Sequence, residues 1–375
     1  MIDGVDLTLM IGPAVPLPVP RVVIDALESV QVTNASGDTP SGFELKFSLL
    51  QKSHLDVLVG VAGGAMPPIV RVVIYVTVQG SAQVLIDGVM THYEVGPGQK
   101  GGLSLVVKGK DLSAVMDVIE LDGIPYPAMP PVLRALTVLA KYAVLGVIPM
   151  TIPSIVEDIP IPVDRIPRQQ GTDYAYVTML ARQCGYVFYF EPGPFPGTSR
   201  AYWGPEIKVG TPQPALNTDM DMFTNVESLS FRFDKESKEL PVVFIHNKET
   251  KVPIPIPIPD ITPLNPPLGL VPPLPPRITF LTDTAKQSPV SAVMTGLAYA
   301  STHADCVSAT GSLDVVRYGH ILKSRALVGV RGAGVLFDGL YYVRSVTHDL
   351  KRGAYKQSFE LARNGLVSTV PSVPT

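Results

Sequence analysis

The feature that most constrains the fold is a strict alternation of residue types near the end of the chain. One set of alternate side chains is mostly apolar and consists of Tyr355, Gln357, Phe359 and Leu361. The residues between them are Lys356, Ser358 and Glu360. This period is typical of an antiparallel strand with one buried face. The run 339–350 is rich in aromatic and β-branched residues and is separated from this strand by Arg352 and Gly353, so the sequence predicts a β-hairpin.

The first part of the chain is also β-like. Apolar residues alternate with polar ones at Phe43, Leu45, Phe47 and Leu49, and again at Ile74, Val76 and Val78. Asp87 and Gly88 lie between two apolar runs and predict a hairpin turn. A further strand is expected over 103–107, before turn residues at 108–111. Short strands at this spacing predict a small barrel or sandwich.

The pattern then changes to that of a helix. This helix is expected to begin at Pro131, which suits the first turn, and to stop at Gly146. Its expected buried stripe consists of Val132, Leu133, Leu136, Leu139, Ala140 and Ala143. The change predicts an insertion of helical structure into a mainly β chain.

A second helix is expected over 173–183, capped by Thr172 and ended by Gly185. Its inward residues are predicted to be Tyr176, Val177, Leu180 and Cys184. A strand over 186–191 follows, which makes the middle of the chain an α/β region.

Strands return in the last part of the chain and are interrupted by prolines. Alternation marks Leu229, Phe231 and Phe233, and another strand is expected over 242–246. Segment 251–277 contains 11 prolines, with a PIPIPIP repeat that is not expected to join a sheet ladder and favours polyproline II. Two interpretations stay open for it, a partly disordered surface loop and an arm docked on a neighbouring subunit. A third helix is expected from Ser288 and Pro289 to about His303.

The amino-acid composition bears on contacts between subunits and on nucleic-acid binding. Charged residues make up 17% of the chain, below the ~25% of a typical soluble protein, and the mean hydropathy is positive. Buried contacts between subunits would explain this, and so would an average shifted by 38 prolines and many valines. A formal net charge of −3 with scattered Lys and Arg predicts no nucleic-acid binding.

No targeting or membrane segment is predicted. The N-terminus has no basic start of a signal peptide, and the most apolar helix-like run, 132–150, is interrupted by Arg134 and Lys141. Cys184 and Cys306 are too few for a disulfide framework. We expect both to be reduced, in helix-like contexts, in a protein of the cytoplasm.

The sequence predicts no metal site. The histidines, none of which form a pair at the spacing of a helical zinc site, are His54, His92, His246, His303, His320 and His348. The cysteines form no CxxC motif, and His348 with Asp349 is interpreted as polarity at a strand end.

Catalytic motifs are absent too. There is no GxSxG, and the glycine-containing segments 108–111 and 329–334 lack the spacing of phosphate-binding loops and are interpreted as turns. Two acidic pairs, Glu157 with Asp158 and Asp219 with Asp221, lie in loop-like sequence without an aromatic platform for a sugar. We therefore predict no catalytic, cofactor-binding or metal-binding residue and no enzyme activity.

Aromatic residues of the middle region allow two interpretations. They could line a ligand groove or, more often at strand period, build a core or an interface, and they are Tyr186, Phe188, Tyr189, Phe190, Tyr202 and Trp203. Arg168, Asp173 and Tyr174 are expected to form a polar cluster that fixes a helix start.

Two blocks of sequence resemble a known family. GLYYVRSVTH, RGAYKQSF and LARNGL in 339–366 are similar to the C-terminal end of the phage late control protein D family. The segment IPRQQGTDYAYVTMLARQCGYVFYFEPG from Ile166, then AYWGP and TNVESLSF, resembles the middle of that family in the same order. The resemblance covers roughly Gly109 to Leu366, and the proline segment 251–277 has no counterpart in it.

Members of that family are baseplate hubs of contractile tails and injection systems, related to the hub part of type VI secretion spike proteins. The resemblance implies a mainly β fold with two tube-protein-like β-barrel domains and a middle α/β domain. The implied domains are 1–112, 113–222 and 223–375, the last interrupted by 251–277.

The resemblance also implies a function. The chain would be a homotrimeric symmetry adaptor that joins a six-fold inner tube to a three-fold spike. Its partners would be itself, the inner tube or a tube-initiator protein, the spike and baseplate wedge components, in a particle assembled in the bacterial cytoplasm. The alternative is a glycan-binding or cell-wall-degrading tail module, suggested by Trp203 and the neighbouring tyrosines.

Overall fold

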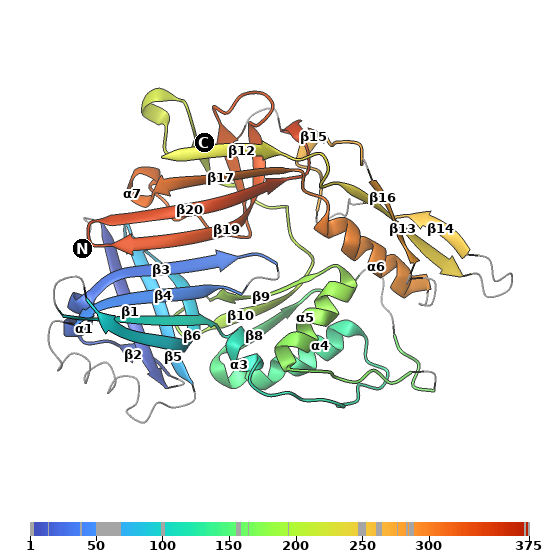
Figure 1. Ribbon diagram of the computed structural model, residues 1–375, viewed down its shortest axis with the longest axis horizontal. Helices are drawn as coiled ribbons and strands as arrows, with labels where there is room; N and C mark the ends of the chain where they lie inside the picture. Colours follow the sequence, from blue (N-terminus) through green and yellow to red (C-terminus); the bar gives the residue numbers. More distant parts are fainter. Residues whose placement is uncertain are drawn as a thin grey trace.

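The structure is a computed structural model that describes residues 4–13, 15–37, 40–49, 69–98, 102–154, 159–163, 165–193, 195–246, 253–259, 265–275, 277–282, 284, 289–370 and 373. The chain is mainly β, as predicted, with an α/β region in the middle and a small projecting sheet (Figure 1).

One large sheet of 13 strands runs through the molecule. Along its path the strands are β12 (Ser228–Phe233), β17 (Val307–Asp314), β20 (Ala354–Arg363), β19 (Gly339–Lys351), β3 (Leu27–Ala35), β4 (Gly42–Leu49), β7 (Leu103–Asp111), β6 (Ser81–Pro97), β5 (Val70–Val78), β1 (Val5–Pro13) and β2 (Leu17–Pro18). Neighbours along this path are antiparallel. Off the path, β18 (Leu327–Arg331) pairs with β19, and β11 (Gln213–Asn217) lies parallel to β18.

Strand β19 joins the β regions from the two ends of the chain. Its first half pairs with β18, and its second half pairs with β3 from Ser345 opposite Ala35 to Lys351 opposite Ser29. Strand β20 pairs with β19 from Tyr342 to Lys351, with a bulge at Arg344. A single apolar core extends from the first strands to the last. The two β regions therefore share one sheet and one core.

The predicted C-terminal hairpin is confirmed. Strands β19 and β20 are joined at Gly353, whose φ of +82° suits a glycine. The apolar face predicted from the alternation is buried, and its members are Tyr355, Gln357, Phe359 and Leu361. Strands β4, β5 and β12 also confirm their predicted alternating segments.

The predicted hairpin turn at Asp87 and Gly88 is wrong, because both residues lie inside β6. Asp87 is buried and accepts hydrogen bonds from Arg71 Nε and Nη2, each at 2.7 Å. A Cβ on Gly88 would lie 2.2 Å from the carbonyl oxygen of Lys110, so the glycine serves a close strand approach. The turn lies instead at Gln79 and Gly80, both with positive φ.

The turn predicted over 108–111 is wrong as well. Strand β7 continues through Asp111, and Gly109 faces the ring of Phe43 with no room for a Cβ. In 329–334 the first residues belong to β18, and the predicted turn lies only at Gly332 to Gly334.

The middle region packs helices on a second sheet in the order β8–β10–β9. Its elements are α3 (Ser113–Met116), α4 (Pro131–Ala140), the 3-10 helix η1 (Lys141–Leu145), β8 (Val147–Thr151), α5 (Asp173–Cys184), β9 (Val187–Pro192) and β10 (Ser199–Gly204). Helix α5 begins and ends as predicted, since Thr172 accepts a hydrogen bond from the Ala175 N–H and Gly185 is left-handed. Its predicted inward face is buried.

Helix α4 begins at Pro131 as predicted, and Gly146 ends the helical run, but its buried face is rotated. Leu133 and Leu136 are exposed by 47% and 39%, whereas Arg134 is buried. The predicted buried stripe is wrong because Arg134 faces inward and donates a hydrogen bond to the Tyr176 hydroxyl of α5. The local sequence pattern does not reveal this partner.

The proline segment forms part of the fold of its own chain. Strand β14 (Pro253–Pro257) pairs with β13 (Glu239–His246), which also pairs with β16 (Arg277–Leu281), and α6 (Pro289–Thr302) covers this sheet. Strand β15 (Gly269–Val271) pairs with β21 (Leu366–Ser368).

The prediction that the PIPIPIP repeat joins no ladder is therefore wrong. With prolines at every second position, all missing N–H groups point to one side, and β14 turns that side outward as an edge strand. The predicted strand over 242–246 and the third helix are confirmed by β13 and α6. Short helices α1 (Arg21–Ala26), η2 (Asp221–Phe223) and α7 (Val315–Tyr318) complete the described elements.

Candidate functional site

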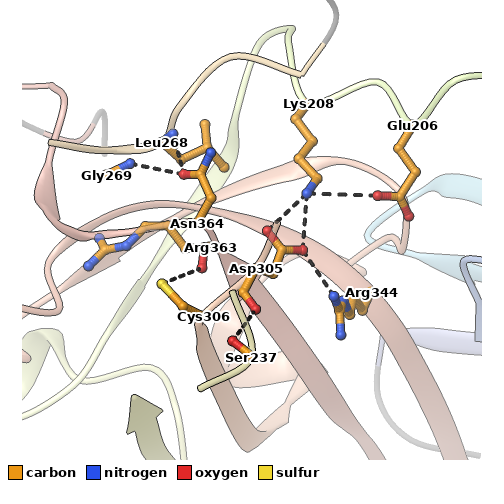
Figure 2. Close-up of polar contacts among 10 residues, drawn as sticks. All are labelled: Glu206, Lys208, Ser237, Leu268, Gly269, Asp305, Cys306, Arg344, Arg363 and Asn364. Carbon is orange, nitrogen blue, oxygen red and sulfur yellow. Dashed lines mark hydrogen bonds and ion pairs between the residues drawn. The ribbon is translucent and has the colours of Figure 1, made fainter. Parts of the chain in front are cut away.

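Four charged side chains meet where the middle region joins the last β region (Figure 2). Glu206 and Lys208 lie in the segment between β10 and β11, Asp305 precedes β17, and Arg344 is the bulge residue of β19. Lys208 Nζ lies 3.0 Å from each carboxylate oxygen of Asp305 and 3.8 Å from Oε2 of Glu206. Arg344 Nη2 lies 3.0 Å from Asp305 Oδ2. We call these four residues the junction cluster.

The centre of the junction cluster is removed from solvent, whereas the side chains of Glu206 and Arg344 at its margin are exposed by 27% and 41%. The side chains of Lys208 and Asp305 are exposed by only 1% and 6%. Burial by itself would raise the pKa of Asp305, but Lys208 and Arg344 outweigh it and hold that pKa below its ordinary value. Burial raises the pKa of Glu206, and its more distant contact with Lys208 only partly opposes this. Asp305 is thus the carboxylate that forms close ion pairs with both Lys208 and Arg344.

Side-chain hydrogen bonds also hold the backbone around the junction cluster in place. Arg363 donates to the carbonyl oxygens of Leu336 and Asp338 at 2.7 and 2.9 Å, and its guanidinium lies over the ring of Tyr341. Asn364 Oδ1 accepts from the Leu268 N–H at 2.8 Å, which fastens the proline segment to β20 (Figure 2). These contacts hold backbone segments together.

Arg325 connects all three parts of the chain. Its guanidinium donates to the Ala35 carbonyl oxygen at the end of β3 and to that of Phe190 in β9, the latter at 3.4 Å. It also lies 3.9 Å from the centre of the Tyr189 ring. Its own backbone is left-handed, with φ of +62°, a conformation rare for a residue with a side chain. A polar cleft of about 300 Å³ lies beside it, between the three parts.

The aromatic residues singled out from the sequence belong to a core. Trp203 is fully buried, and its indole N–H donates to the Val177 carbonyl oxygen at 3.3 Å. The ring of Tyr186 packs against it with centroids 5.0 Å apart, and Phe188 and Phe190 are buried beside it. Of the two interpretations, the core is confirmed for Phe188, Phe190, Tyr202 and Trp203.

The predicted polar cluster at the start of α5 exists around Asp173, with different partners. Asp173 accepts from Lys141 Nζ at 3.1 Å, from the Tyr142 hydroxyl at 2.8 Å and from Gln169 Nε2 at 2.6 Å. Arg168 donates to the Gly123 carbonyl oxygen instead. Tyr174 packs against Phe188. The cluster anchors α5 to the end of α4.

His348 is not a polar residue at a strand end. It is buried within β19, and its Nδ1 shares a hydrogen bond with the Tyr355 hydroxyl at 2.8 Å. Burial lowers its pKa to about 3, so the ring is neutral at physiological pH.

Both cysteines are free and buried, and Cys306 precedes β17 rather than lying in a helix.

The remaining predictions concern metal sites, the two acidic pairs and membrane-spanning segments. Across the part of the chain that the structure describes, no group of His, Cys, Asp and Glu is arranged to hold a metal ion. Asp219 and Asp221 are exposed, the latter as the first residue of η2, and Glu157 and Asp158 lie outside the described residues. Within the described ranges, no helix has the length and hydropathy needed to cross a membrane.

Sequence reasoning missed the junction cluster and Arg325. Lys208 and Asp305 are separated by 97 residues, and Arg325 and Ala35 by 290, so no local pattern links them. The one available signal was the pair Glu206 and Lys208, the two charged residues of segment 205–212.

Replacing Asp305 tests how much the junction cluster contributes. Asp305→Asn leaves the buried ammonium of Lys208 without its close anion, so we expect the free energy of unfolding to fall by about 3–5 kcal/mol. Denaturation in urea measures this. The matched control is Asp349→Asn, which breaks an exposed pair with Lys351 and should cost at most about 1 kcal/mol. Equal losses in both variants would contradict a stabilising role for the cluster.

The buried histidine predicts a pH dependence. The unfolded chain takes up a proton at His348 below its ordinary pKa of 6.5, but the folded chain does so only near 3. Between these values the unfolded state binds more protons, so stability falls as the pH falls, by up to about 1.4 kcal/mol per pH unit. His348→Gln should remove this slope from urea unfolding measured between about pH 4 and 6. His92→Gln, at an exposed position, should retain it, and an unchanged slope in His348→Gln would refute the assignment.

Comparison with known proteins rests on structure alone, because no family profile and no curated protein matches the sequence. A tail protein from Neisseria meningitidis matches with a TM-score of 0.62 and 13% identity, over 97% of this chain and 98% of that one. The 43 kDa tail protein of prophage MuSo2 from Shewanella oneidensis matches with a TM-score of 0.60 and 14% identity, over 96% and 98%. A type VI secretion system component of Escherichia coli matches with a TM-score of 0.55 and 10% identity, over 93% and 77%. At these identities the likeness establishes the fold, and this chain has the fold shared by those two tail proteins and that secretion component.

Proposed function

We propose that the chain is a structural hub in the baseplate of a contractile phage tail or of a phage-tail-like injection particle. The observation that carries the proposal is the likeness to two tail proteins, one of them from a prophage, over nearly the full length of this chain and of each of theirs. The sequence blocks similar to the late control protein D family agree with this proposal. They include strands β9, β19 and β20 and helix α5, which contribute buried residues to the fold.

The hub would be a homotrimer that adapts six-fold to three-fold symmetry. Strands β1–β7 form one β region and β11, β12 and β17–β20 form the other, so each chain offers two β regions within one sheet. Three chains would present six such regions in a ring, which fits a six-fold tube on one side and a three-fold spike on the other. In this role the chain meets the inner tube or its initiator, the spike and wedge components, in a baseplate assembled in the bacterial cytoplasm.

Exposed apolar side chains support contacts with other subunits. On the β6–β7 hairpin Tyr93 and Val95 are exposed by 50% and 45%. At loops of the last β region Met222, Phe223 and Val335 are exposed by 94%, 73% and 80%. Covering such side chains in an assembly would remove apolar surface from water and agrees with the low charged fraction of the chain.

The role proposed here is passive and needs no chemical turnover. The alternative, a glycan-binding or wall-degrading module, was suggested by Trp203 and the neighbouring tyrosines, and the full burial of Trp203 in the core disfavours it. We therefore place the function in assembly contacts and in the rigid coupling of the three parts by Arg325 and the junction cluster.

Oligomeric state tests the proposal. Light scattering of the purified chain over a range of concentrations should give a mass three times the 40.2 kDa of one chain. Negative-stain images should show a three-fold ring with six lobes. A chain that stays monomeric at every concentration, even when mixed with candidate tube and spike proteins, would contradict the hub role.

A further inference from the structure

The junction cluster holds an amine against a carboxyl group, away from water. Lys208 Nζ lies 3.0 Å from Oδ1 and 3.0 Å from Oδ2 of Asp305, and both side chains are almost fully removed from solvent. The buried ring of Tyr342 has its centroid 5.5 Å from Nζ. A nitrogen equally close to both oxygens lies beside the carboxyl carbon between them, within the ~3–3.5 Å expected of atoms about to react. The pair is thus placed as an amine and an acid are placed before they condense.

The backbone on both sides of this pair is held in place. The carbonyl oxygen of Asp305 accepts a hydrogen bond from the Ser237 hydroxyl at 3.1 Å (Figure 2). On the other side, the Tyr202 hydroxyl donates to the carbonyl oxygen of Pro205 at 2.6 Å, three positions before Lys208. Two groups held in one reactive geometry behave as if at effective concentrations of about 10⁵–10⁸ M. The fold therefore removes much of the entropic barrier to a bond between them.

The two other members of the cluster supply what such a condensation needs. Arg344 Nη2 lies 3.0 Å from Oδ2 of Asp305, where it can stabilise negative charge that develops on this oxygen. Glu206 Oε2 lies 3.8 Å from Lys208 Nζ, and catalytic contacts are often this long before a reaction begins. Burial raises the pKa of Glu206, which brings its neutral and charged forms closer in free energy near neutral pH and suits it to carry a proton.

We propose that Lys208 and Asp305 condense within the folded chain to an isopeptide bond, with no other protein taking part. The bond joins the segment between β10 and β11 to the residue before β17, across 97 positions of sequence. It therefore crosslinks the middle region to the last β region. The proposal does not depend on the baseplate role, because the reaction takes place inside one chain, once, and without turnover.

The reaction releases one molecule of water. A proton passes from the Lys208 ammonium to Oδ1 of Asp305, which leaves a neutral amine and a neutral acid. The lone pair of the amine forms the new bond to the carboxyl carbon, and Oδ2 carries the negative charge beside Arg344. Glu206 carries the surplus proton of the nitrogen to the Oδ1 hydroxyl, the carbon–Oδ1 bond breaks, and water leaves with its electron pair. Lys208 and Arg344 favour the ionised form of Asp305, so the neutral pair is a minor species and the reaction is slow.

Mass spectrometry of the intact, purified full-length chain tests the proposal. After incubation until the mass no longer changes, the measured mass should be lower than the sequence mass by one molecule of water. Loss of water at an aspartate followed by glycine, such as Asp122 with Gly123, gives the same mass, so the change must also be located. Tandem mass spectrometry of a tryptic digest should find a branched peptide that contains both Lys208 and Asp305 and is uncut after Lys208.

Two variants separate the bond from the ion pair. Lys208→Arg keeps the positive charge, but a guanidinium is always protonated and is no nucleophile, so this variant should keep its full sequence mass. Glu206→Gln keeps the size of the side chain but cannot carry a proton, so the bond should form at least about 100-fold more slowly. Full sequence mass in the unaltered chain, the same loss of water in Lys208→Arg, or loss of water located elsewhere would overturn the proposal. A crosslinked chain that stays monomeric would contradict the hub role alone.

Discussion

The structure depends on the pairing of β19 with β3. Seven residue pairs, from Ser345 with Ala35 to Lys351 with Ser29, connect segments more than 300 positions apart in the chain. The hydroxyls of Thr33 and Thr347 meet across this pairing at 3.1 Å. Strand β19 also pairs with β18 and β20, so it has three neighbours in the sheet. The bulge at Arg344 lies where its partner on one side changes from β18 to β3.

The bulge in β19 places Arg344 in the ion pairs of the junction cluster. It leaves Arg344 without a partner in the β19–β20 register, and its side chain reaches Asp305, which Lys208 contacts from the segment after β10. Buried ion pairs of this kind contribute little net stability but are costly to break. Together with Arg325 they hold the middle region against both β regions.

What the sequence predicted well was local. The alternation of Tyr355 to Leu361 and the caps Thr172 and Gly185 depend on near neighbours, and the structure confirms them. Asp87 and Gly88 misled the prediction because the ion pair with Arg71, made across two strands, outweighs their turn propensity. The PIPIPIP repeat misled it because an edge strand tolerates prolines on its outer side. The junction cluster could not be predicted, since its central pair, Lys208 and Asp305, is separated by 97 residues of sequence.

Hydrogen exchange of the full-length chain tests most directly whether the β regions act as one body. If they do, amides of β3 should exchange with the same high protection as those of β19 and β20, because all open only in the global unfolding of the shared core. Rapid exchange in β3 and β4 while β19 and β20 stay protected would mean that the first β region opens by itself. That result would contradict the account of a single rigid sheet on which the proposed adaptor role rests.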